Sequence, residues 1–267
     1  MPRYLGLPEL ASEHGGRVDE MLAHLHLSML VMFVGWGAFF LYLVFRYRSG
    51  HNPKARYQGV SGTIPMIFVA LAFVEELVLL FGSSIPLFAA RNAGPPGGAE
   101  TVIVQAVGEQ FAWNFHYPGA DGVFGRTDPR LIDSQTNALG LDPADKAGQD
   151  DIITTNQLHL PLGKYALIRL SSKDVIHSFY LPEMRVKQDV IPGMTFPVWF
   201  KPTVSTAQMR ERKGNPEFNY EVGCAQLCGL GHARMRGYLT IETPEEFQAW
   251  LVEHTPKAKS AEDSFWN

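Results

Sequence analysis

The sequence predicts a two-helix transmembrane hairpin, followed by an all-β sandwich or barrel with a short C-terminal helix. Two long apolar runs precede residue 91, and short β-rich runs recur between turn signals after residue 98. The overall composition, 46% hydrophobic and 19% charged, conceals this contrast because it averages two different halves. The predicted divisions are an external N-terminal segment (1–24), the hairpin (25–90), a linker (91–98), the β domain (99–255) and a C-terminal tail (256–267).

Both apolar runs are long enough to cross a bilayer. Residues 25–45, LHLSMLVMFVGWGAFFLYLVF, contain no Asp, Glu, Lys or Arg, and a helix of this length spans about 30 Å of hydrocarbon. Residues 64–90, IPMIFVALAFVEELVLLFGSSIPLFAA, are equally apolar except for Glu75 and Glu76. The alternatives are a buried core helix or a secretory signal, but the apolar part of a signal is only about 7 to 15 residues long and lies nearer the N-terminus.

The charges around the two spans predict their orientation. The loop between them, RYRSGHNPKARYQGVSGT, contains basic residues and no acidic residue, whereas the segment before the first span is acidic. Because basic loops stay in the cytoplasm, we expect both termini to lie on the outer side of the membrane.

Glu75 and Glu76 are unusual inside a span, since a carboxylate near the bilayer centre costs about 2.5 kcal/mol or more unless it meets protein, water or a partner. Neighbouring helical positions point about 100° apart, so a single crevice accommodates only one of them. The alternatives that stay open are a helix–helix contact with another subunit, a helix broken at that depth, and proton handling. Each predicts that the hairpin does not stand alone in lipid.

The β domain is predicted from short runs such as ETVIVQAVG, QFAWNFHY, KYALIRLSS, DVIHSFYLP, TFPVWFKP, FNYEVG and MRGYLTIE. Several alternate apolar and polar residues, which is typical of half-buried strands, and many short strands favour a sandwich or barrel. Residues 118–151 are rich in Asp, Gly and Pro and lack this period, so we expect a long solvated loop rather than a cation site.

A short helix is predicted near the C-terminus. In TPEEFQAWLVEH, Thr243 is the expected N-cap, Pro244 takes the first helical position and Glu246 completes a capping box. Phe247 and Trp250 then lie on one face of this helix, where they can pack against the β domain.

Both cysteines of the chain lie in one glycine-rich stretch, VGCAQLCGLGHARM. Cys224, Cys228 and His232 follow at intervals of four, and Met235 comes three residues later. A disulfide is one interpretation, but so short a loop gives little entropic stabilisation and leaves His232 and Met235 without a role. Structural zinc is a second interpretation, although a thioether is a poor zinc ligand. Two thiolates, an imidazole and a thioether form a soft donor set that favours copper.

A mononuclear blue copper site requires one cysteine, so the second thiolate needs another explanation. Two thiolates could bridge two copper ions, each of which also needs a histidine. His177, in SSKDVIHSFYLPEMRVKQDVIPG, is the best candidate for the second histidine because it lies on a predicted strand of the same domain.

With these motifs, Asp174-Val-Ile-His177-Ser-Phe and Cys224-x₃-Cys228-x₃-His232-x₂-Met235, the chain resembles subunit II of haem–copper cytochrome c oxidases. The resemblance covers nearly the whole chain and implies that the β domain is a cupredoxin-like Greek-key barrel with a binuclear copper A centre. It implies the copper ligands His177, Cys224, the main-chain carbonyl of Gln226, Cys228, His232 and Met235.

Two positions depart from the family pattern. Gln226 stands where the family usually has a Glu whose side chain reaches a magnesium ion at the boundary with subunit I, and an amide is a weaker ligand for this hard cation. Asp189 and Lys187 are expected near the same boundary. Phe111 stands where the family commonly has the surface tryptophan that receives the electron, and Trp113 keeps the second aromatic position. The alternative for Phe111 is a core aromatic.

The resemblance also implies a function. The subunit would accept electrons from cytochrome c or a membrane-bound donor complex and pass them to haem in subunit I, which holds haems and further copper. There oxygen is reduced to water with proton translocation, so this chain belongs to an oxidoreductase and translocase without containing catalytic residues itself. The expected partners are subunits I and III, the donor and the lipid bilayer, with no nucleic acid. The expected location is a bacterial-type inner (plasma) membrane, with the β domain and both termini on the periplasmic side.

Other classes share parts of this pattern. Subunit II of a quinol oxidase has the hairpin and the barrel but lacks the thiolate loop. The copper A subunit of a nitric-oxide or nitrous-oxide reductase-like complex shares the loop, but nitrous-oxide reductase is normally soluble, which the hairpin contradicts. A membrane-anchored cupredoxin with a disulfide is the non-redox alternative.

Overall fold

The computed structural model describes residues 6–51, 54, 57, 62–97 and 100–256, so the predicted tail lies outside the described residues except for Pro256. The chain divides into two compact units. One contains Met1–Leu7 and Gly16–Asn92, and the other contains Pro8–Gly15 and Ala93–Asn267.

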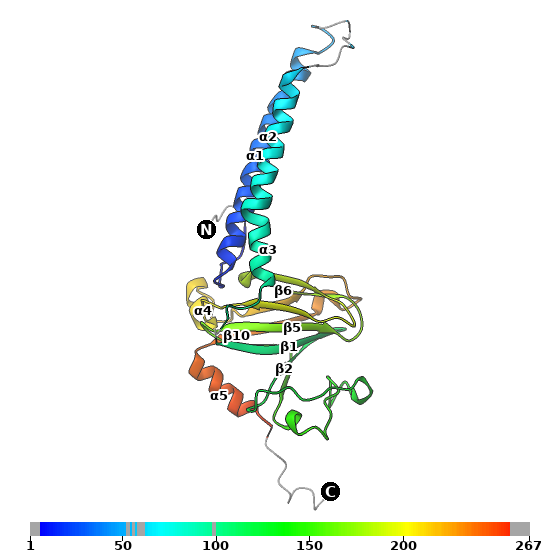
Figure 1. Cartoon of the computed structure of the whole chain (residues 1–267), viewed down its shortest axis with the longest axis vertical. Helices are drawn as coiled ribbons and strands as arrows, with labels where there is room; N and C mark the ends of the chain where they lie inside the picture. The colour runs from blue at the N-terminus through cyan, green and yellow to red at the C-terminus, as the bar shows by residue number, and fades with distance from the viewer. Residues whose placement is uncertain (1–5, 52–53, 55–56, 58–61, 98–99, 257–267) are drawn as a thin grey trace, which may run out of the picture. The chain divides into compact units, whose positions relative to one another are not determined.

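The first unit is the helical hairpin. Its elements are α1 (Gly15–Arg46), α2 (Thr63–Leu79), the π-helical turn η2 (Leu80–Ser84) and α3 (Ile85–Asn92). By length and composition, Gly15–Arg46 and Pro65–Asn92 can each cross a membrane, and α1 and α2 run side by side (Figure 1). Helix α1 begins well before the apolar run at residue 25, because apolarity determines which residues suit lipid and not where helical hydrogen bonding begins.

A π-helical turn interrupts the second predicted span. The amide of Ile85 donates to the carbonyl of Leu80, a five-residue step instead of the usual four. The π-helical turn therefore contains one more residue than an α-helical turn. Within it, the hydroxyl of Ser84 lies 3.7 Å from Sδ of Met21 on α1.

The second unit is a β-sandwich. Its strands are β1 (Thr101–Glu109), β2 (Ala112–Tyr117), β3 (Ile152–Thr155), β4 (Gln157–Pro161), β5 (Tyr165–Ser172), β6 (His177–Leu181), β7 (Val186–Val190), β8 (Phe196–Phe200), β9 (Tyr220–Cys224) and β10 (Arg236–Glu242). One sheet has the order β3-β2-β1-β5-β8 and the other β4-β10-β9-β6-β7. The pairs β1–β5 and β4–β10 are parallel, so the chain crosses between the sheets repeatedly rather than forming simple hairpins.

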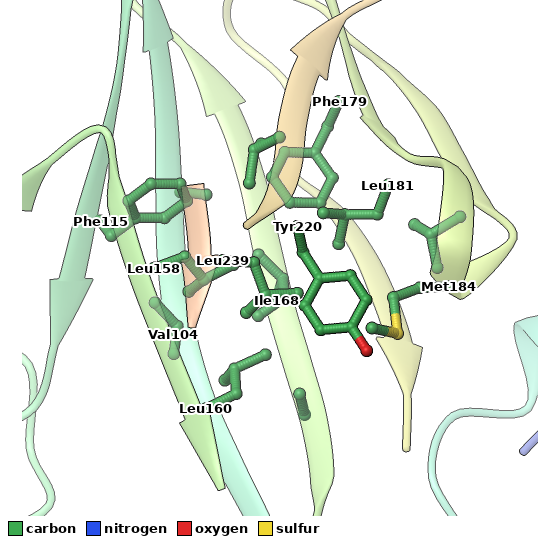
Figure 2. Close-up of a cluster of buried hydrophobic side chains, with 14 of the residues drawn as sticks. Val104, Phe115, Leu158, Leu160, Ile168, Phe179, Leu181, Met184, Tyr220 and Leu239 are labelled. Carbon is green, nitrogen blue, oxygen red and sulfur yellow. The ribbon is translucent and has the colours of Figure 1, made fainter. Parts of the chain in front are cut away.

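Alternating side chains from both sheets fill the core. In β5, Ala166, Ile168 and Leu170 are buried and Arg169 is exposed, as the strand period predicts. Figure 2 shows Ile168 facing Phe179 and Tyr220 of the opposite sheet. The predicted fold class, a hairpin of two apolar helices followed by a cupredoxin-like β domain, is confirmed.

The predicted C-terminal helix is α5 (Pro244–His254). Thr243 and Glu246 form the expected capping box, and Phe247 and Trp250 are buried. The structure adds a helix that the sequence analysis did not predict, α4 (Thr206–Lys213), which begins with a capping box of Ser205 and Gln208.

The segment Pro8–Gly15, which we call the strap, packs on the β-sandwich. The amide of Ala11 donates to the carbonyl of Glu183, and the amide of Thr203 donates to the carbonyl of Ala11. The hydroxyl of Ser12 donates to the carbonyl of Met184 at 2.7 Å. The strap is therefore part of the β unit, although it precedes the helical hairpin in the sequence.

The long loop 118–151 folds back on β2 and β3 through a buried hydrogen bond between His116 and Asp151. Nε2 of His116 lies 2.5 Å from Oδ2 of Asp151, and both side chains are fully buried. Asp151 also accepts hydrogen bonds from the amides of Gly119 and Gly125. The other aspartates of the loop mainly cap turns or pair with Arg126 and Arg130, which is typical of a self-supporting surface loop.

Candidate metal centre

The sheet that contains β6 and β9 brings distant parts of the sequence to one end of the sandwich. Strand β6 begins at His177, β9 ends at Cys224, and the ladder pairs Phe179 with Cys224. The loop from Ala225 to Met235 then returns to β10, and the amide of Cys224 donates to the carbonyl of Met235. The predicted donors therefore converge where these strands end.

The two thiols lie at the centre of this cluster and are not bonded to each other. Their sulfurs are 3.9 Å apart. Sγ of Cys224 lies 3.9 Å from Nδ1 of His177 and 3.2 Å from the carbonyl oxygen of Gln226. Sγ of Cys228 lies 3.7 Å from Nδ1 of His232 and 3.7 Å from Sδ of Met235. Each thiol is thus flanked by one imidazole nitrogen and one weaker donor.

The donor set fits a soft metal. The ligand atoms of His177, Cys224 and Cys228 all lie within 4.8 Å of one another, close enough for these residues to hold a metal ion together. Two thiolates, two imidazoles and a thioether favour copper over hard cations such as magnesium. His232 and Met235 flank Cys228 and extend this group on one side.

The two thiols have different acidities. Burial alone would raise the pKa of Cys224, but hydrogen bonds with His177 and with the backbone lower the pKa to about 6. Burial and the neighbouring Cys224 raise the pKa of Cys228 to about 11. The thiols titrate as a pair, and the hydrogen bonds from His177 and the backbone favour one thiolate, the metal-binding form, in this pair.

A carboxylate orients the ring of His177. Nε2 of His177 donates to Oδ1 of Asp174 at 2.8 Å, which leaves Nδ1 directed at Cys224. Asp174 also accepts a hydrogen bond from the amide of Gln110. Asp174 is part of the sequence motif before His177, but no role was predicted for it. Its spacing of three residues before a ligand histidine is the signal that was missed.

The tip between β1 and β2 contacts the loop from Ala225 to Met235, which we call the cysteine loop. Nε2 of Gln110 donates to the carbonyl of Cys228 at 2.6 Å. The ring of Phe111 lies against the loop glycines: a Cβ added to Gly231 would lie 2.3 Å from Cδ2 of Phe111. Sequence reasoning did not identify Gln110, because a single glutamine in a turn carries no pattern.

The two aromatic residues proposed for electron input occupy different positions. Phe111 is 37% exposed beside the cysteine loop, whereas Trp113 is fully buried. The Trp113 ring stands edge-on to the ring of His177, with 6.0 Å between centroids. Only Phe111 can touch another protein directly.

The remaining predicted residues lie apart from the ligand atoms or at their edge. The side chain of Gln226 is exposed, so only its carbonyl faces the thiols. Asp189 is exposed on β7, opposite Ser178 of β6.

In the hairpin, Glu75 contacts α1 and Glu76 does not. Oε1 of Glu75 accepts a hydrogen bond from the hydroxyl of Ser28 at 2.6 Å, and Nε2 of His24 lies 3.4 Å from the same oxygen. Glu76 is exposed, and its side chain has no hydrogen bond or ion pair within the described part of the chain.

Comparison with known proteins gives consistent matches. The family model described as "Cytochrome C oxidase subunit II, periplasmic domain" matches residues 102–242. The chain is 40% identical over 156 residues to "Alternative cytochrome c oxidase subunit 2" of Bradyrhizobium diazoefficiens, covering 58% of this chain and 52% of that protein. It therefore spans about half the length of that relative.

A second relative matches along most of the chain. The chain is 30% identical over 266 residues to "Cytochrome c oxidase subunit 2" of Thermostichus vulcanus, covering 91% of this chain and 77% of that protein. Among solved structures, the periplasmic domain of subunit II of cytochrome oxidase of Bradyrhizobium japonicum matches 58% of this chain and 94% of that chain, with 26% identity and a TM-score of 0.39.

Proposed function

Because the chain belongs to the family of cytochrome c oxidase subunit II, we propose that it is the subunit through which electrons enter a membrane terminal oxidase. It is a membrane protein whose β domain lies outside the membrane. The proposed donor is cytochrome c or an equivalent protein. The proposed acceptor is haem in subunit I, where haems and further copper reduce oxygen to water with proton translocation.

The convergence of the sulfur and nitrogen donors at the end of the sandwich carries this proposal. We assign the ligands of a binuclear copper A centre, a centre that the family implies, to His177, Cys224, the carbonyl of Gln226, Cys228, His232 and Met235. The supporting observation is the 3.9 Å separation of two unbonded thiols, each flanked by an imidazole nitrogen and a weaker donor. A disulfide would leave these imidazoles without a metal to bind.

When bound, a binuclear copper centre supplies reversible one-electron chemistry. The protein's own residues determine how well the donors are held. Asp174 fixes the ring of His177, Gln110 fixes the carbonyl of Cys228, and the strand ladder places Cys224 beside His177. Rigid donors limit rearrangement when an electron arrives or leaves, which favours fast transfer.

The other residue assignments are part of the proposal. Phe111 is the residue through which an electron would reach the centre, because it is exposed and touches the cysteine loop. We place Asp189 near the boundary with subunit I, where the exposed amide of Gln226 would be a weak ligand for magnesium. Glu75 joins the two spans through Ser28 and His24, and proton handling by Glu75 or Glu76 stays a prediction.

The test is copper analysis and electron paramagnetic resonance of the full-length chain purified in detergent after copper loading. We expect two copper ions per chain that share one unpaired electron. The variant Met235→Leu should alter the resonance signal, whereas Met194→Leu, at an exposed methionine outside the donor group, should leave it unchanged. A metal-free chain with a Cys224–Cys228 disulfide would contradict the proposal.

A further inference from the structure

Lys173, the residue after strand β5, joins three separate parts of the β unit. Its ammonium group forms an ion pair with Glu109 at the end of β1 and donates to the carbonyl of Ala138, in loop 118–151, at 2.7 Å. Its amide donates to the carbonyl of Gly108 at 3.0 Å. The Lys173 side chain is only 15% exposed, and a lysine is seldom buried to this degree unless its charge is paired.

Glu109 is held from its other side by a row of polar side chains. Nδ2 of Asn114 donates to Oε1 of Glu109 at 2.7 Å, and the hydroxyl of Thr155 donates to Oδ1 of Asn114 at 3.0 Å. Asn114 is fully buried, and its two neighbours in β2 belong to the core, so its amide lies on the opposite face of the sheet. The row therefore runs from β3 over β2 and β1 to the end of β5, which are neighbours in that order in one sheet.

Two short backbone segments carry the ion pair, and the residue after each charged residue holds a proposed copper ligand. Gln110, after Glu109, donates from its side chain to the carbonyl of Cys228. Asp174, after Lys173, accepts a hydrogen bond from the histidine at the start of β6. The amide of Gln110 donates to Asp174 at 2.7 Å, so the two segments are joined twice, by the ion pair and by this hydrogen bond. We call Glu109, Gln110, Lys173 and Asp174 the clamp.

The backbone that Lys173 holds also forms one wall beside the ring of His177. A Cβ added to Gly108 would lie 3.0 Å from Cδ2 of His177 and 3.2 Å from the ring of Trp113, both closer than ordinary contact. Because the carbonyl of Gly108 accepts a hydrogen bond from the amide of Lys173, movement of Lys173 displaces this wall as well.

The part of loop 118–151 that reaches the clamp has its shape fixed by one side chain. Nδ2 of Asn137 donates to the carbonyl of Leu141 at 2.9 Å, and Oδ1 of Asn137 accepts from the amide of Leu141 at 2.8 Å. Ala138 lies within this turn, so its carbonyl is a fixed acceptor for Lys173. The loop is therefore bonded to the clamp as well as to the buried histidine of β2.

We propose that loop 118–151 and the ion pair between Glu109 and Lys173 position the metal centre from outside. Glu109 and Lys173 are positioning residues: neither is a proposed ligand, and they act by keeping Gln110 and Asp174 in place. This inference rests on the proposed function and adds a role for the loop, which contributes no proposed ligand. Ligands that are held by a rigid surround keep their geometry when an electron arrives or leaves.

The first test is amide hydrogen exchange of the full-length, copper-free chain in detergent. We expect Lys173→Met to speed exchange about tenfold at the amide of Gln110, which donates to Asp174. The amide of Leu162, which donates to the carbonyl of Glu242 near the start of β5, should exchange at an unchanged rate. Equal acceleration at both amides would show a loss of overall stability instead of a loosened clamp, and would overturn the inference.

Copper loading gives the second test. We expect Lys173→Met to weaken copper binding about tenfold, measured by competition with a chelator, and to change the copper hyperfine pattern in electron paramagnetic resonance. Lys173→Arg, which keeps the charge and the donors, should restore both. Lys164→Met is the matched control and should change neither, because Lys164 forms its ion pair with Glu100 at the opposite end of β5. Values in Lys173→Met equal to those of the unmodified chain would overturn the inference.

Asn137→Ala tests the loop by itself, because it releases the turn of Ala138 without altering the clamp. We expect exchange at the amide of Gln110 to become faster and the copper resonance to change, both less than in Lys173→Met. Asp121→Ala, at the exposed loop tip, is the control. If exchange at Gln110 is unchanged in Asn137→Ala, the loop does not position the centre. This variant also decides the question if Lys173→Met does not fold.

The two measurements separate this inference from the proposed function. An unmodified chain that binds no copper refutes the proposed function, whereas exchange at the amide of Gln110, measured without copper, still tests the clamp. A chain that binds copper, and whose Lys173→Met variant is unchanged in exchange and in resonance, refutes only the clamp.

Discussion

Nε2 of His177 donates a hydrogen bond to Asp174, so the ring presents Nδ1 to the sulfur of Cys224. Removing the carboxylate frees the ring to rotate and to change tautomer. We expect Asp174→Ala to weaken copper binding about 10- to 100-fold. Copper affinity is measured by competition with a chelator. Asp189→Ala, at an exposed carboxylate on β7, is the control, and equal affinities in the two variants would contradict this role.

The contact between Gly231 and Phe111 gives a second prediction. The backbone of Gly231, with φ of −90°, suits any residue, so an added methyl group acts only by its clash with the Phe111 ring. We expect Gly231→Ala to destabilise the loop by about 1 kcal/mol or more and to change the copper signal.

Two further variants test this explanation. Gly223→Ala in the neighbouring strand should be harmless, because the nearest atom to its added Cβ is 3.8 Å away. Phe111→Ala combined with Gly231→Ala should restore the signal, since it removes the other half of the clash. A double variant as disturbed as the single one would show that the ring is not the cause.

The sequence predicted the parts of this fold in which periodicity and composition are strong. The two spans, strands such as β5, and α5 with its Thr243 cap all carry patterns that depend on neighbouring residues alone. β7 has the sequence VKQDV, with three polar residues between two valines, and it forms a strand only because β6 pairs with it. Such an edge strand shows no apolar alternation and was missed.

The ligands of the candidate centre were predictable because they have a distinctive spacing in the sequence. The residues that hold these ligands in place were not predictable. Gln110 reaches a carbonyl 118 residues away, a relation that no local pattern reports. Helix α4 did have a local signal, Ser205 with Gln208 and a following Gly214 in the left-handed conformation. The helix was not predicted because its sequence is mostly polar and has no apolar face, with Met209 as the main buried side chain.

The buried pair of His116 and Asp151 predicts a pH-dependent loop. Burial lowers the pKa of His116, although the hydrogen bond and the charge of Asp151 oppose this shift. Nδ1 of His116 has no hydrogen-bond partner among the described residues. A second proton on the ring would therefore be buried at Nδ1 without an acceptor. Because the unfolded segment then binds protons more readily than the folded one, stability should fall as pH drops below about 6.5.

Hydrogen exchange at the amides of Gly119 and Gly125, which both donate to Asp151, reports this loop directly. We expect Asp151→Ala to destabilise the loop by about 2 kcal/mol, because it leaves buried donors without an acceptor, and to speed exchange at both amides. Asp121→Ala, at the exposed loop tip, should leave both rates unchanged. Exchange that is equally protected at pH 5 and pH 7.5, after correction for intrinsic rates, would contradict the role of His116.

Glu75 gives a prediction within the membrane. If its contact with Ser28 joins the helices, Glu75→Gln should preserve turnover, because the amide oxygen still accepts the hydrogen bond, and Glu75→Leu should weaken retention of the chain in the assembled complex. Turnover and proton translocation are measured in reconstituted vesicles. Unchanged values in the Glu75→Gln, Glu76→Gln double variant would end the proton-handling hypothesis.

The strap has a consequence for how the protein is made. The ribosome synthesises Pro8–Gly15 before either span, but its partners Glu183, Met184 and Thr203 emerge only after both spans are complete. Strap and partners can meet only if the start of the chain has already reached the same side of the membrane as the β domain. Insertion of the first helix in the correct direction is therefore a precondition for maturation of a domain that begins about eighty residues later.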